Sequence, residues 1–346
     1  MNHRPYHLGA RFLAAVTVLV TAALFSLAPA STAQAVVKKT AKPSAKATAK
    51  PPAKTTHHST SKTRRPTSTA RPAVKRLGRS PYVGAIVVEA DSGKVLFEDN
   101  ADGTSYPASV LKMMTLLITL DNIERGTLHL EDNVTATREA ALTGGSQVYL
   151  CEREVMTLDD MLYALMIQSA NDAAVALAVH IAGSKPAFVE LMNERAQEIG
   201  MKHTHFASPH GLPPARGQQP DVTTARDMSL LARVLLKHPT ALRYTSTHQH
   251  SIRNGRFMMR SHNHLLNTFR GCDGLKTGYT YAGGYSIAAT AVRDGIRVVV
   301  VVLSSDSIRT RDRKAAELLD LGLRRAPSMV GAAGGEQQQV GVLEVR

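Results

Sequence analysis

Acidic residues are distributed unevenly along this 346-residue chain, and their absence from its first quarter constrains what that part can fold into. No Asp or Glu precedes Glu89, although 15 of the 42 Lys and Arg residues do. The rest of the chain has nearly balanced charge, with 27 basic against 28 acidic residues. A nucleic-acid-binding domain carries its basic excess within the folded part. The net charge of +14 therefore indicates a basic N-terminal arm and argues against a nucleic-acid partner.

The first 35 residues have the pattern of an export signal. Arg4 and Arg11 precede an apolar run from Phe12 to Leu27, and Ala33-Gln34-Ala35 offers a cleavage site. We predict cleavage after Ala35 or, as the alternative, retention of the segment as a membrane anchor. In both cases the body of the protein is expected in the periplasm or at the extracellular face of the cell envelope.

Residues 36–79 consist almost entirely of Lys, Ala, Thr, Pro, Ser and Arg, which cannot bury enough apolar surface to offset the entropy of folding. We predict a disordered linker here, either a solvated spacer or a segment that binds anionic envelope polymers. A folded domain is expected over residues 80–325, followed by a flexible tail over 326–346. The two cysteines, Cys151 and Cys272, are predicted to be buried free thiols and not a disulfide.

Hairpin patterns stand at both ends of the predicted domain. Segments 83–89 and 94–97 flank Asp91-Ser92-Gly93, and segments 284–292 and 296–304 flank Asp294-Gly295. Between and after them, periodicity and capping residues predict helices over 109–120, 157–168, 172–181, 185–199, 224–237 and 310–321. Strands from both chain ends with helices between them indicate an α+β fold, an antiparallel sheet flanked by helices with an inserted all-α subdomain.

One set of residues at a predicted helix start has the spacing of an activated nucleophile. In Ser109-Val110-Leu111-Lys112, positions i and i+3 share one helix face, so the lysine can reach the serine hydroxyl. A partly buried lysine with a lowered pKa can act as a base on that hydroxyl. The same spacing at Ser59 and Lys62, inside the predicted linker, shows that this motif alone carries little weight.

Two further polar sets follow along the chain. Ser169-Ala170-Asn171 falls where one predicted helix gives way to the next, so its hydroxyl and amide either relay a proton and hold a substrate or merely cap a helix. Lys276-Thr277-Gly278 lies in an extended segment that enters the second hairpin. A cation and a hydroxyl on a strand edge suit a substrate carboxylate, although a surface turn is the simpler alternative.

Taken in order, Ser109, Ser169 and Lys276 form the trio found in class A β-lactamases and penicillin-binding proteins. Over roughly Tyr82 to Leu323 the sequence resembles the low-molecular-mass penicillin-binding proteins, the D-alanyl-D-alanine carboxypeptidases. The surrounding strings that carry the resemblance are Tyr106-Pro107-Ala108, Gly200-Met201, Pro209-His210-Gly211-Leu212, Thr224-Ala225-Arg226-Asp227-Met228 and Gly274 to Thr280.

The resemblance implies a serine DD-peptidase of the β-lactamase-like fold, acting on peptidoglycan stem peptides without a cofactor or metal. Ser109 is then the acylated nucleophile and Lys112 its base, with Ser169 as proton shuttle and Asn171 as a ligand of Lys112 and of the substrate amide. The remaining implied roles are recognition of the terminal carboxylate by Lys276 and Thr277, close approach at Gly278, and an oxyanion hole from the backbone N–H groups of Ser109 and Tyr279. A second cation for the carboxylate would be Arg309, Arg311 or Arg313.

Differences from related families bear on whether β-lactams are hydrolysed and on which peptide bond is cleaved. Ala170 stands where class A β-lactamases carry Asp, and the loop from His203 to Thr223 holds one carboxylate, Asp221, and no Glu that would serve as a deacylating base. We therefore expect β-lactams to be covalent inhibitors and not substrates, which weighs against a β-lactamase. A chain that stops soon after Leu323 also resembles the endopeptidase branch, which cuts peptidoglycan crosslinks and is the closest alternative to a carboxypeptidase.

Two rivals from other classes remain. The histidine pairs 203/205, 248/250 and 262/264 raise the possibility of a zinc DD-peptidase, but no carboxylate-rich ligand set accompanies them. A non-catalytic envelope-binding protein that retains the fold is the other rival, and it requires that Ser109 fail to acylate. The oligomeric state is left open by the sequence.

Overall fold

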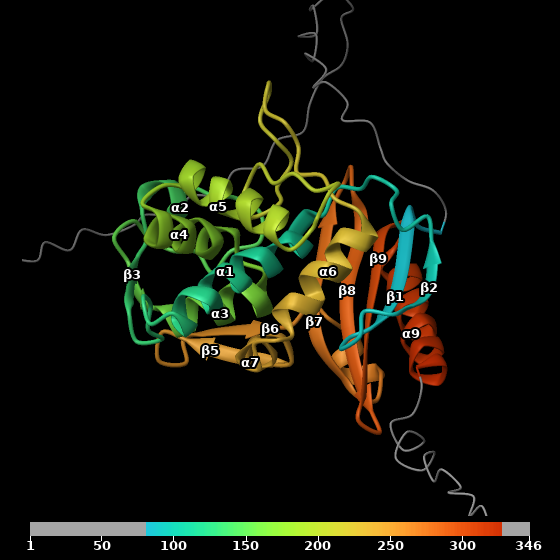
Figure 1. Cartoon of the computed structure of the whole chain (residues 1–346). Coiled ribbons are helices and arrows are strands. Elements are labelled where there is room, and N and C mark those ends of the chain that lie inside the picture. Colours follow the sequence, from blue (N-terminus) through green and yellow to red (C-terminus); the bar gives the residue numbers. More distant parts are fainter. Residues whose placement is uncertain (1–80, 327–346) are drawn as a thin grey trace, which may run out of the picture. The chain divides into compact units, whose positions relative to one another are not determined.

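The computed structural model describes residues 81–326 (Figure 1). The predicted export signal, most of the predicted tail and the whole basic linker lie outside the described residues. Among the described residues, no single helix is long and apolar enough to cross a membrane, and α4 (Asn171–Ala182) and α5 (Lys185–Glu198) meet those criteria only jointly, as a pair bent by 84°.

A five-stranded antiparallel sheet forms from the two ends of the described chain, as the hairpin patterns predicted. Its strands are β1 (Gly84–Glu89), β2 (Val95–Asp99), β7 (Cys272–Thr280), β8 (Gly284–Arg293) and β9 (Ile296–Ser305), in the order β2-β1-β9-β8-β7. Because β1 pairs with β9, the N-terminal hairpin joins the C-terminal strands in one sheet. Strand β7 therefore lies at an edge of the sheet.

Strand β9 shows why both faces of this sheet are covered. It contains five consecutive valines, and successive side chains of a strand point to opposite faces. Val299 and Val301 belong to the core that the sheet shares with the helical block, whereas Val298 and Val300 belong to a second core beneath α9 (Ile308–Arg325). Figure 1 shows α9 on one side of the sheet and the remaining long helices on the other.

The helical block is built around two buried helices. The helices between the hairpins that correspond to predicted helices are α1 (Lys112–Glu124), α3 (Leu158–Tyr163), α4 (Asn171–Ala182), α5 (Lys185–Glu198) and α6 (Ala225–Leu235). Residues Lys112 to Leu120 of α1 and Asn171 to Ala178 of α4 are all buried. The predicted cap at Thr157 is confirmed, since its side chain accepts a hydrogen bond from the backbone N–H of Asp160 at 3.1 Å.

Short elements escaped the sequence-based prediction. The short helices are α2 (Arg138–Ala141), α7 (Thr240–Thr245) and α8 (Leu265–Thr268). The short strands form one antiparallel pair, β3 (Asn133–Thr135) with β4 (Val155–Thr157), and one hairpin, β5 (Gln249–Ile252) with β6 (Phe257–Arg260). Each has three to six residues, which is too short for a periodic pattern to be distinguished.

Two predicted helices differ from the structure where the polar motifs lie. The predicted helix over 157–168 ends as α at Tyr163 and continues as a π-helical turn, η2 (Ala164–Gln168), that Ser169 terminates in a left-handed conformation with φ 60°. The helix predicted from Ser109 starts as a 3₁₀ turn, η1 (Ala108–Leu111), and becomes α-helical only at Lys112. π-turns are frequent at functional sites, so the irregularity itself points to the motif.

The cysteine prediction is half correct. Cys151 and Cys272 are both free, as expected. Cys151 is exposed and not buried, because it lies in the loop before β4, where its backbone N–H donates to the Glu154 carboxylate. Cys272, at the start of β7, is partly buried, and burial raises the pKa of its thiol to about 11.

Candidate functional site

A cleft of about 600 Å³ lies beside edge strand β7, between the sheet and the helical block. Six of the eight predicted site residues line it, namely Ser109, Ser169, Asn171, Thr277, Gly278 and Tyr279. Lys112 and Lys276 lie beneath its floor, fully buried or nearly so, and reach the lining residues through hydrogen bonds. The structure therefore brings all eight residues together from three separate parts of the chain.

Lys112 donates to three oxygen atoms. Its Nζ lies 2.9 Å from Ser109 Oγ, 2.7 Å from Asn171 Oδ1 and 2.9 Å from the backbone oxygen of His210. None of these acceptors carries a charge, so no salt bridge compensates for the burial of this ammonium. The sequence-based expectation that Lys112 reaches Ser109 from one turn away is met by this geometry.

Burial lowers the pKa of Lys112. The side chain is 0% exposed, and desolvation lowers its pKa well below the ordinary lysine value, with the neighbouring charge of Lys276 as the second cause. The carboxylates of Asp172 and Asp221 act in the opposite direction and raise its pKa. A neutral amine 2.9 Å from a serine hydroxyl is suited to take that hydroxyl's proton.

The junction between η2 and α4 presents Ser169 and Asn171 to the cleft. The Asn171 side chain does not cap α4, because its Oδ1 accepts from Lys112 and its Nδ2 donates to the backbone oxygen of Gly144 at 2.8 Å. The helix-capping alternative for this motif is therefore wrong. Ser169 Oγ instead accepts a hydrogen bond from Lys276 Nζ at 2.9 Å.

Lys276 occupies the sheet side of the cleft. Besides Ser169, its Nζ contacts the backbone oxygen of Thr277 at 2.9 Å, and the side chain is 2% exposed. Burial, followed by the charge of Arg311, lowers its pKa to about 7. The surface-turn alternative for this motif is wrong, since Lys276 and Thr277 are buried within β7.

Two glycines allow the backbone segments around Ser109 to approach closely. A Cβ at Gly278 would lie 3.0 Å from the backbone nitrogen of Ser109 and 2.9 Å from the oxygen of Pro107, so a side chain there would push β7 away from η1. Gly211 has φ +79°, and a Cβ there would lie 2.2 Å from the oxygen of Ala108. Both positions therefore require glycine.

The structure selects Arg311 among the three arginines that the sequence left open. Arg311 is 4% exposed and lines the cleft, whereas Arg309 and Arg313 are exposed outside it. Its guanidinium pairs with Asp312 at 2.7 Å. Position 311 lies on the first turns of α9, and only the packing of that helix against the sheet decides which of its arginines faces the cleft.

Sequence reasoning did not assign several further lining residues. These are Gly145, Ser146, Gly211, Leu212, Ser261, His262, His264, Thr280, Tyr285 and Ile308. Burial lowers the pKa of His262 to about 4, with Lys276 as the next cause, so its imidazole is neutral at physiological pH. Tyr285 stacks on Tyr279 with ring centroids 4.2 Å apart. Gly211, Leu212 and Thr280 lie in strings that carry the family resemblance, and His262 and His264 form one of the histidine pairs, but no pattern placed any of these residues in the cleft, which they reach through tertiary packing.

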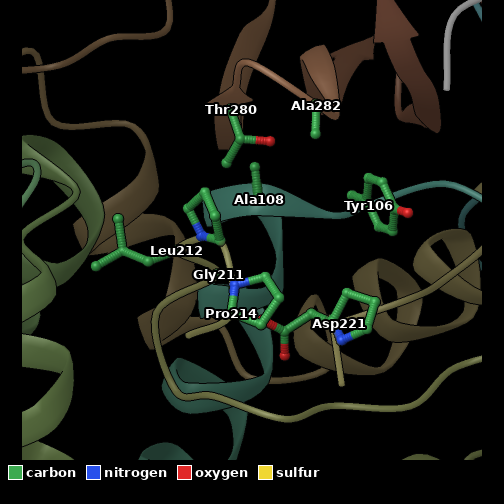
Figure 2. A pocket seen from close by; sticks show the side chains of 10 residues that line it. Tyr106, Ala108, Gly211, Leu212, Pro214, Asp221, Thr280 and Ala282 are labelled. Atoms are coloured by element: carbon green, nitrogen blue, oxygen red, sulfur yellow. The ribbon is translucent and has the colours of Figure 1, made fainter. Parts of the chain in front are cut away.

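A smaller apolar pocket adjoins the cleft. It shares Gly211, Leu212 and Thr280 with the cleft and is lined further by Tyr106, Ala108, Ala282 and prolines of the 213–220 segment (Figure 2). Asp221 lines this pocket and not the cleft. Among the described residues, no carboxylate lines the cleft beside Ser109.

The histidine pairs do not converge on a metal centre. His248 contacts Asn267, His250 contacts Asp160, and His264 contacts Asp312. Within residues 81–326, one group of three potential ligands forms elsewhere, from Asp121, Glu124 and His238 at the far end of α1. The sequence had not indicated that group, in which Asp121 also pairs with Arg195.

Comparison with known proteins agrees with this geometry. The family model described as D-alanyl-D-alanine carboxypeptidase matches residues 82–307. The D-alanyl-D-alanine carboxypeptidase DacF of Bacillus subtilis is 35% identical over 239 residues, which is 68% of this chain and 60% of that protein. DacC of Escherichia coli is 34% identical over 73% of this chain and 64% of its own length. The chain thus spans less than two thirds of these curated relatives.

Solved structures resemble the fold as well. Penicillin-binding protein D2 of Listeria monocytogenes, in its ampicillin-bound form, superimposes with a TM-score of 0.64 at 30% identity and covers 70% of this chain and 97% of that chain. The D-alanyl-D-alanine carboxypeptidase DacD of Francisella tularensis has a TM-score of 0.66 at 29% identity and covers 75% of this chain and 74% of that chain. The predicted α+β fold is therefore confirmed.

Proposed function

Because the chain belongs to the D-alanyl-D-alanine carboxypeptidase family, we propose that it is a serine DD-carboxypeptidase that removes the terminal D-Ala of peptidoglycan stem peptides. The observation that carries this proposal is the contact between the buried Lys112 amine and the Ser109 hydroxyl at 2.9 Å. A buried lysine without a carboxylate partner next to a cleft-lining serine is an arrangement that nucleophilic catalysis needs.

Acylation begins when neutral Lys112 accepts the proton of Ser109 Oγ and the oxygen attacks the carbonyl carbon of the penultimate D-Ala. The negative charge that develops on the carbonyl oxygen is stabilised by the backbone N–H groups of Ser109 and Tyr279. The tetrahedral intermediate collapses, and the leaving D-Ala nitrogen receives a proton from Lys112 or through Ser169, which Lys276 contacts. The product is an ester on Ser109. Water then attacks this ester while Lys112 accepts one of its protons, the bond between the acyl carbon and Ser109 Oγ breaks, and Lys112 returns the proton to Oγ.

Substrate recognition follows from the charges around the cleft. The terminal carboxylate of the substrate binds Lys276, Thr277 and Arg311. The charges of Lys276 and Arg311 lie close enough to interact, and no carboxylate of the described residues lines the cleft to neutralise them. The substrate backbone extends along β7, which has a neighbouring strand on one side only, and the substrate amide contacts Asn171. The acyl side then runs past Thr280 toward the apolar pocket of Figure 2.

β-Lactams act on this protein as covalent inhibitors in our proposal. They acylate Ser109, and the ester persists for two reasons. The amine released by ring opening stays bonded to the acyl group and obstructs the approach of water on the Lys112 side, and no carboxylate of the described residues lines the cleft to activate water from elsewhere. The protein works outside the cytoplasm, exported by residues 1–35, and the Lys/Arg-rich segment 36–79 serves as a spacer or binds anionic envelope polymers. Cleavage of crosslinks remains the alternative activity on the same site.

The proposal is tested with the purified protein, a fluorescent penicillin and a peptide ending in D-Ala-D-Ala. We expect a stable adduct that peptide mapping assigns to Ser109, and release of free D-Ala from the peptide. Ser109→Ala should abolish both while leaving the thermal melt unchanged. D-Ala release that survives in Ser109→Ala would sink the assignment, and rapid turnover of the penicillin would identify a β-lactamase instead.

A further inference from the structure

The backbone oxygen that Lys112 contacts belongs to a segment held by one buried carboxylate. Asp221 is 7% exposed, and its Oδ1 accepts hydrogen bonds from the backbone N–H groups of Ala207 at 2.7 Å and Ser208 at 3.0 Å. Its Oδ2 accepts the hydroxyl of Ser208 at 2.8 Å. A buried carboxylate with three donors fixes the backbone that supplies them.

Ser208 passes this constraint on to the residues that flank the His210 carbonyl. Its Oγ accepts the backbone N–H of Gly211 at 2.9 Å, so the turn from Ser208 to Gly211 is closed by one side chain. From the opposite side, Lys112 Nζ donates to the His210 oxygen at 2.9 Å, and Thr115 Oγ1 donates to the Pro209 oxygen at 3.3 Å. The chain of contacts therefore runs from Asp221 through Ser208 to the oxygen atom that orients the lysine.

The charge of Asp221 also acts on Lys112. Burial raises the pKa of Asp221, and the three hydrogen bonds oppose that effect by stabilising its ionised form. The ionised carboxylate favours the ammonium form of Lys112 and so raises its pKa against the larger effect of burial. The other titratable or charged groups that interact with Lys112 are Lys276 on β7, Asp172 on α4, His210 in the same turn and His262 before α8.

We propose that Asp221 is a positioning residue for the acylation step, which holds the His210 carbonyl through Ser208 and thereby keeps Lys112 Nζ beside Ser109 Oγ. This inference rests on the proposed function, because it requires Lys112 to be the base. It assigns a role to the one carboxylate of the 203–223 loop, which lies outside the cleft and cannot itself activate water there.

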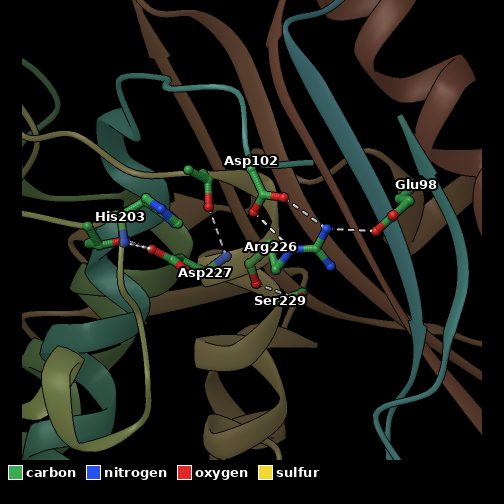
Figure 3. A network of polar contacts seen from close by, with 8 residues as sticks. Glu98, Asp102, His203, Arg226, Asp227 and Ser229 are labelled. Atoms are coloured by element: carbon green, nitrogen blue, oxygen red, sulfur yellow. Dashed lines mark hydrogen bonds and ion pairs between the residues drawn. The ribbon is translucent and has the colours of Figure 1, made fainter. Parts of the chain in front are cut away.

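The test measures the second-order rate of acylation by a fluorescent penicillin as a function of pH, in the full chain and three variants. Ser208→Ala removes the hydroxyl link and retains the charge, whereas Asp221→Asn retains the shape and removes the charge. Asp227→Asn is the matched control. Asp227 is another buried carboxylate that binds the same loop, and Figure 3 shows it beside His203. It accepts hydrogen bonds from the His203 N–H at 2.7 Å and the Thr204 hydroxyl, not from the Ser208 to Gly211 turn.

Ser208→Ala and Asp221→Asn should change different parts of the pH profile of acylation. Ser208→Ala should lower the plateau rate roughly tenfold and leave the acid limb of the pH profile in place. Asp221→Asn should retain the plateau within about threefold and move the acid limb to lower pH, because a lysine without this neighbouring anion loses its proton more readily. Asp227→Asn should change neither the limb nor the plateau by more than about twofold, although it lowers the melting temperature.

Specific outcomes overturn the inference. A Ser208→Ala protein that melts like wild type and acylates at the wild-type rate refutes the link through Ser208. If the acid limb of the Asp221→Asn profile stays at the wild-type pH, Asp221 has no effect on the Lys112 pKa. If Asp227→Asn moves the acid limb by the same amount, the effect is not specific to Asp221. If the wild-type protein itself is not acylated, the proposed function has failed and the positioning role fails with it, a result distinct from the others. Thermal melts of each variant separate misfolding from mispositioning.

Discussion

The two lysines of the cleft are buried to nearly the same extent but lie in different electrostatic surroundings. Lys112, on the helical side, contacts three neutral oxygens, and two nearby carboxylates offset part of the pKa decrease that burial causes. Lys276, on the sheet side, contacts two neutral oxygens, and the charge that adds to burial in lowering its pKa is another cation, Arg311. The first environment suits a base that exchanges a proton with Ser109, and the second suits the binding of an anion.

Removal of the helical-side lysine should have the largest effect. Lys112→Ala eliminates the group that accepts the Ser109 proton, so acylation by penicillin should slow by about 10³-fold or more at neutral pH. The rate is measured by fluorescence on a protein whose circular dichroism matches wild type. Labelling that falls less than tenfold would mean that another group activates Ser109, and the contrast between the two lysines would lose its basis.

Removal of the sheet-side lysine should weaken substrate binding more than chemistry. Lys276→Ala should raise KM for a peptide with a free C-terminal carboxylate by about 30-fold, the loss of a charge-assisted hydrogen bond. A peptide with a C-terminal amide is the matched control, because its KM should hardly change. Equal losses with both peptides would assign Lys276 to the acylation chemistry, as a partner of Ser169.

The pKa of Lys276, about 7, also predicts a pH dependence in the wild-type protein. A carboxylate binds the protonated lysine better, so KM for the free acid should rise as the pH increases through about 7, and KM for the amide should not. A KM for the free acid that does not change with pH would show that substrate binding does not depend on the charge of Lys276.

The smallest effect should come from Arg311, whose charge is partly offset by Asp312 at 2.7 Å. Arg311→Ala should raise KM for the free acid about fivefold. It should also shift the alkaline rise in KM to higher pH, because removing a neighbouring cation raises the pKa of Lys276. Arg313→Ala, an exposed change on the same helix, is the control. A shift in the opposite direction would contradict the electrostatic account of the sheet side.

Much of the site was predictable because its motifs are local. Ser109 and Lys112 are three residues apart, and Ser169 and Asn171 are two apart, so each motif brings its own side chains together whatever the rest of the fold does. The irregular turns that present them were not predictable. A π-turn and a left-handed Ser169 conform to no periodic pattern, and they form because Asn171 is held by Lys112 and by the Gly144 backbone.

The contacts that hold Lys112 and its neighbouring turn in place were harder to foresee, because they join segments that are distant in the sequence. The His210 carbonyl is a backbone atom that any residue would supply, and Asp221 binds the preceding residues Ala207 and Ser208 from fourteen and thirteen positions along the chain. Arg311 was one of three equivalent arginines until helix packing turned it toward the cleft. The Cys151 thiol was expected in the interior on residue type alone, but its loop is exposed.

The amino-acid sequence alone determined the order of the elements, the two hairpins that build the sheet and the three motifs that carry the chemistry, since all of these depend on contacts between near neighbours. Tertiary structure decided the pKa shifts of Lys112 and Lys276, which of the three arginines lines the cleft, and the contact between β7 and the Ser109 turn. These depend on burial and on distances between segments as far apart as Ser109 and Gly278, which no local pattern encodes.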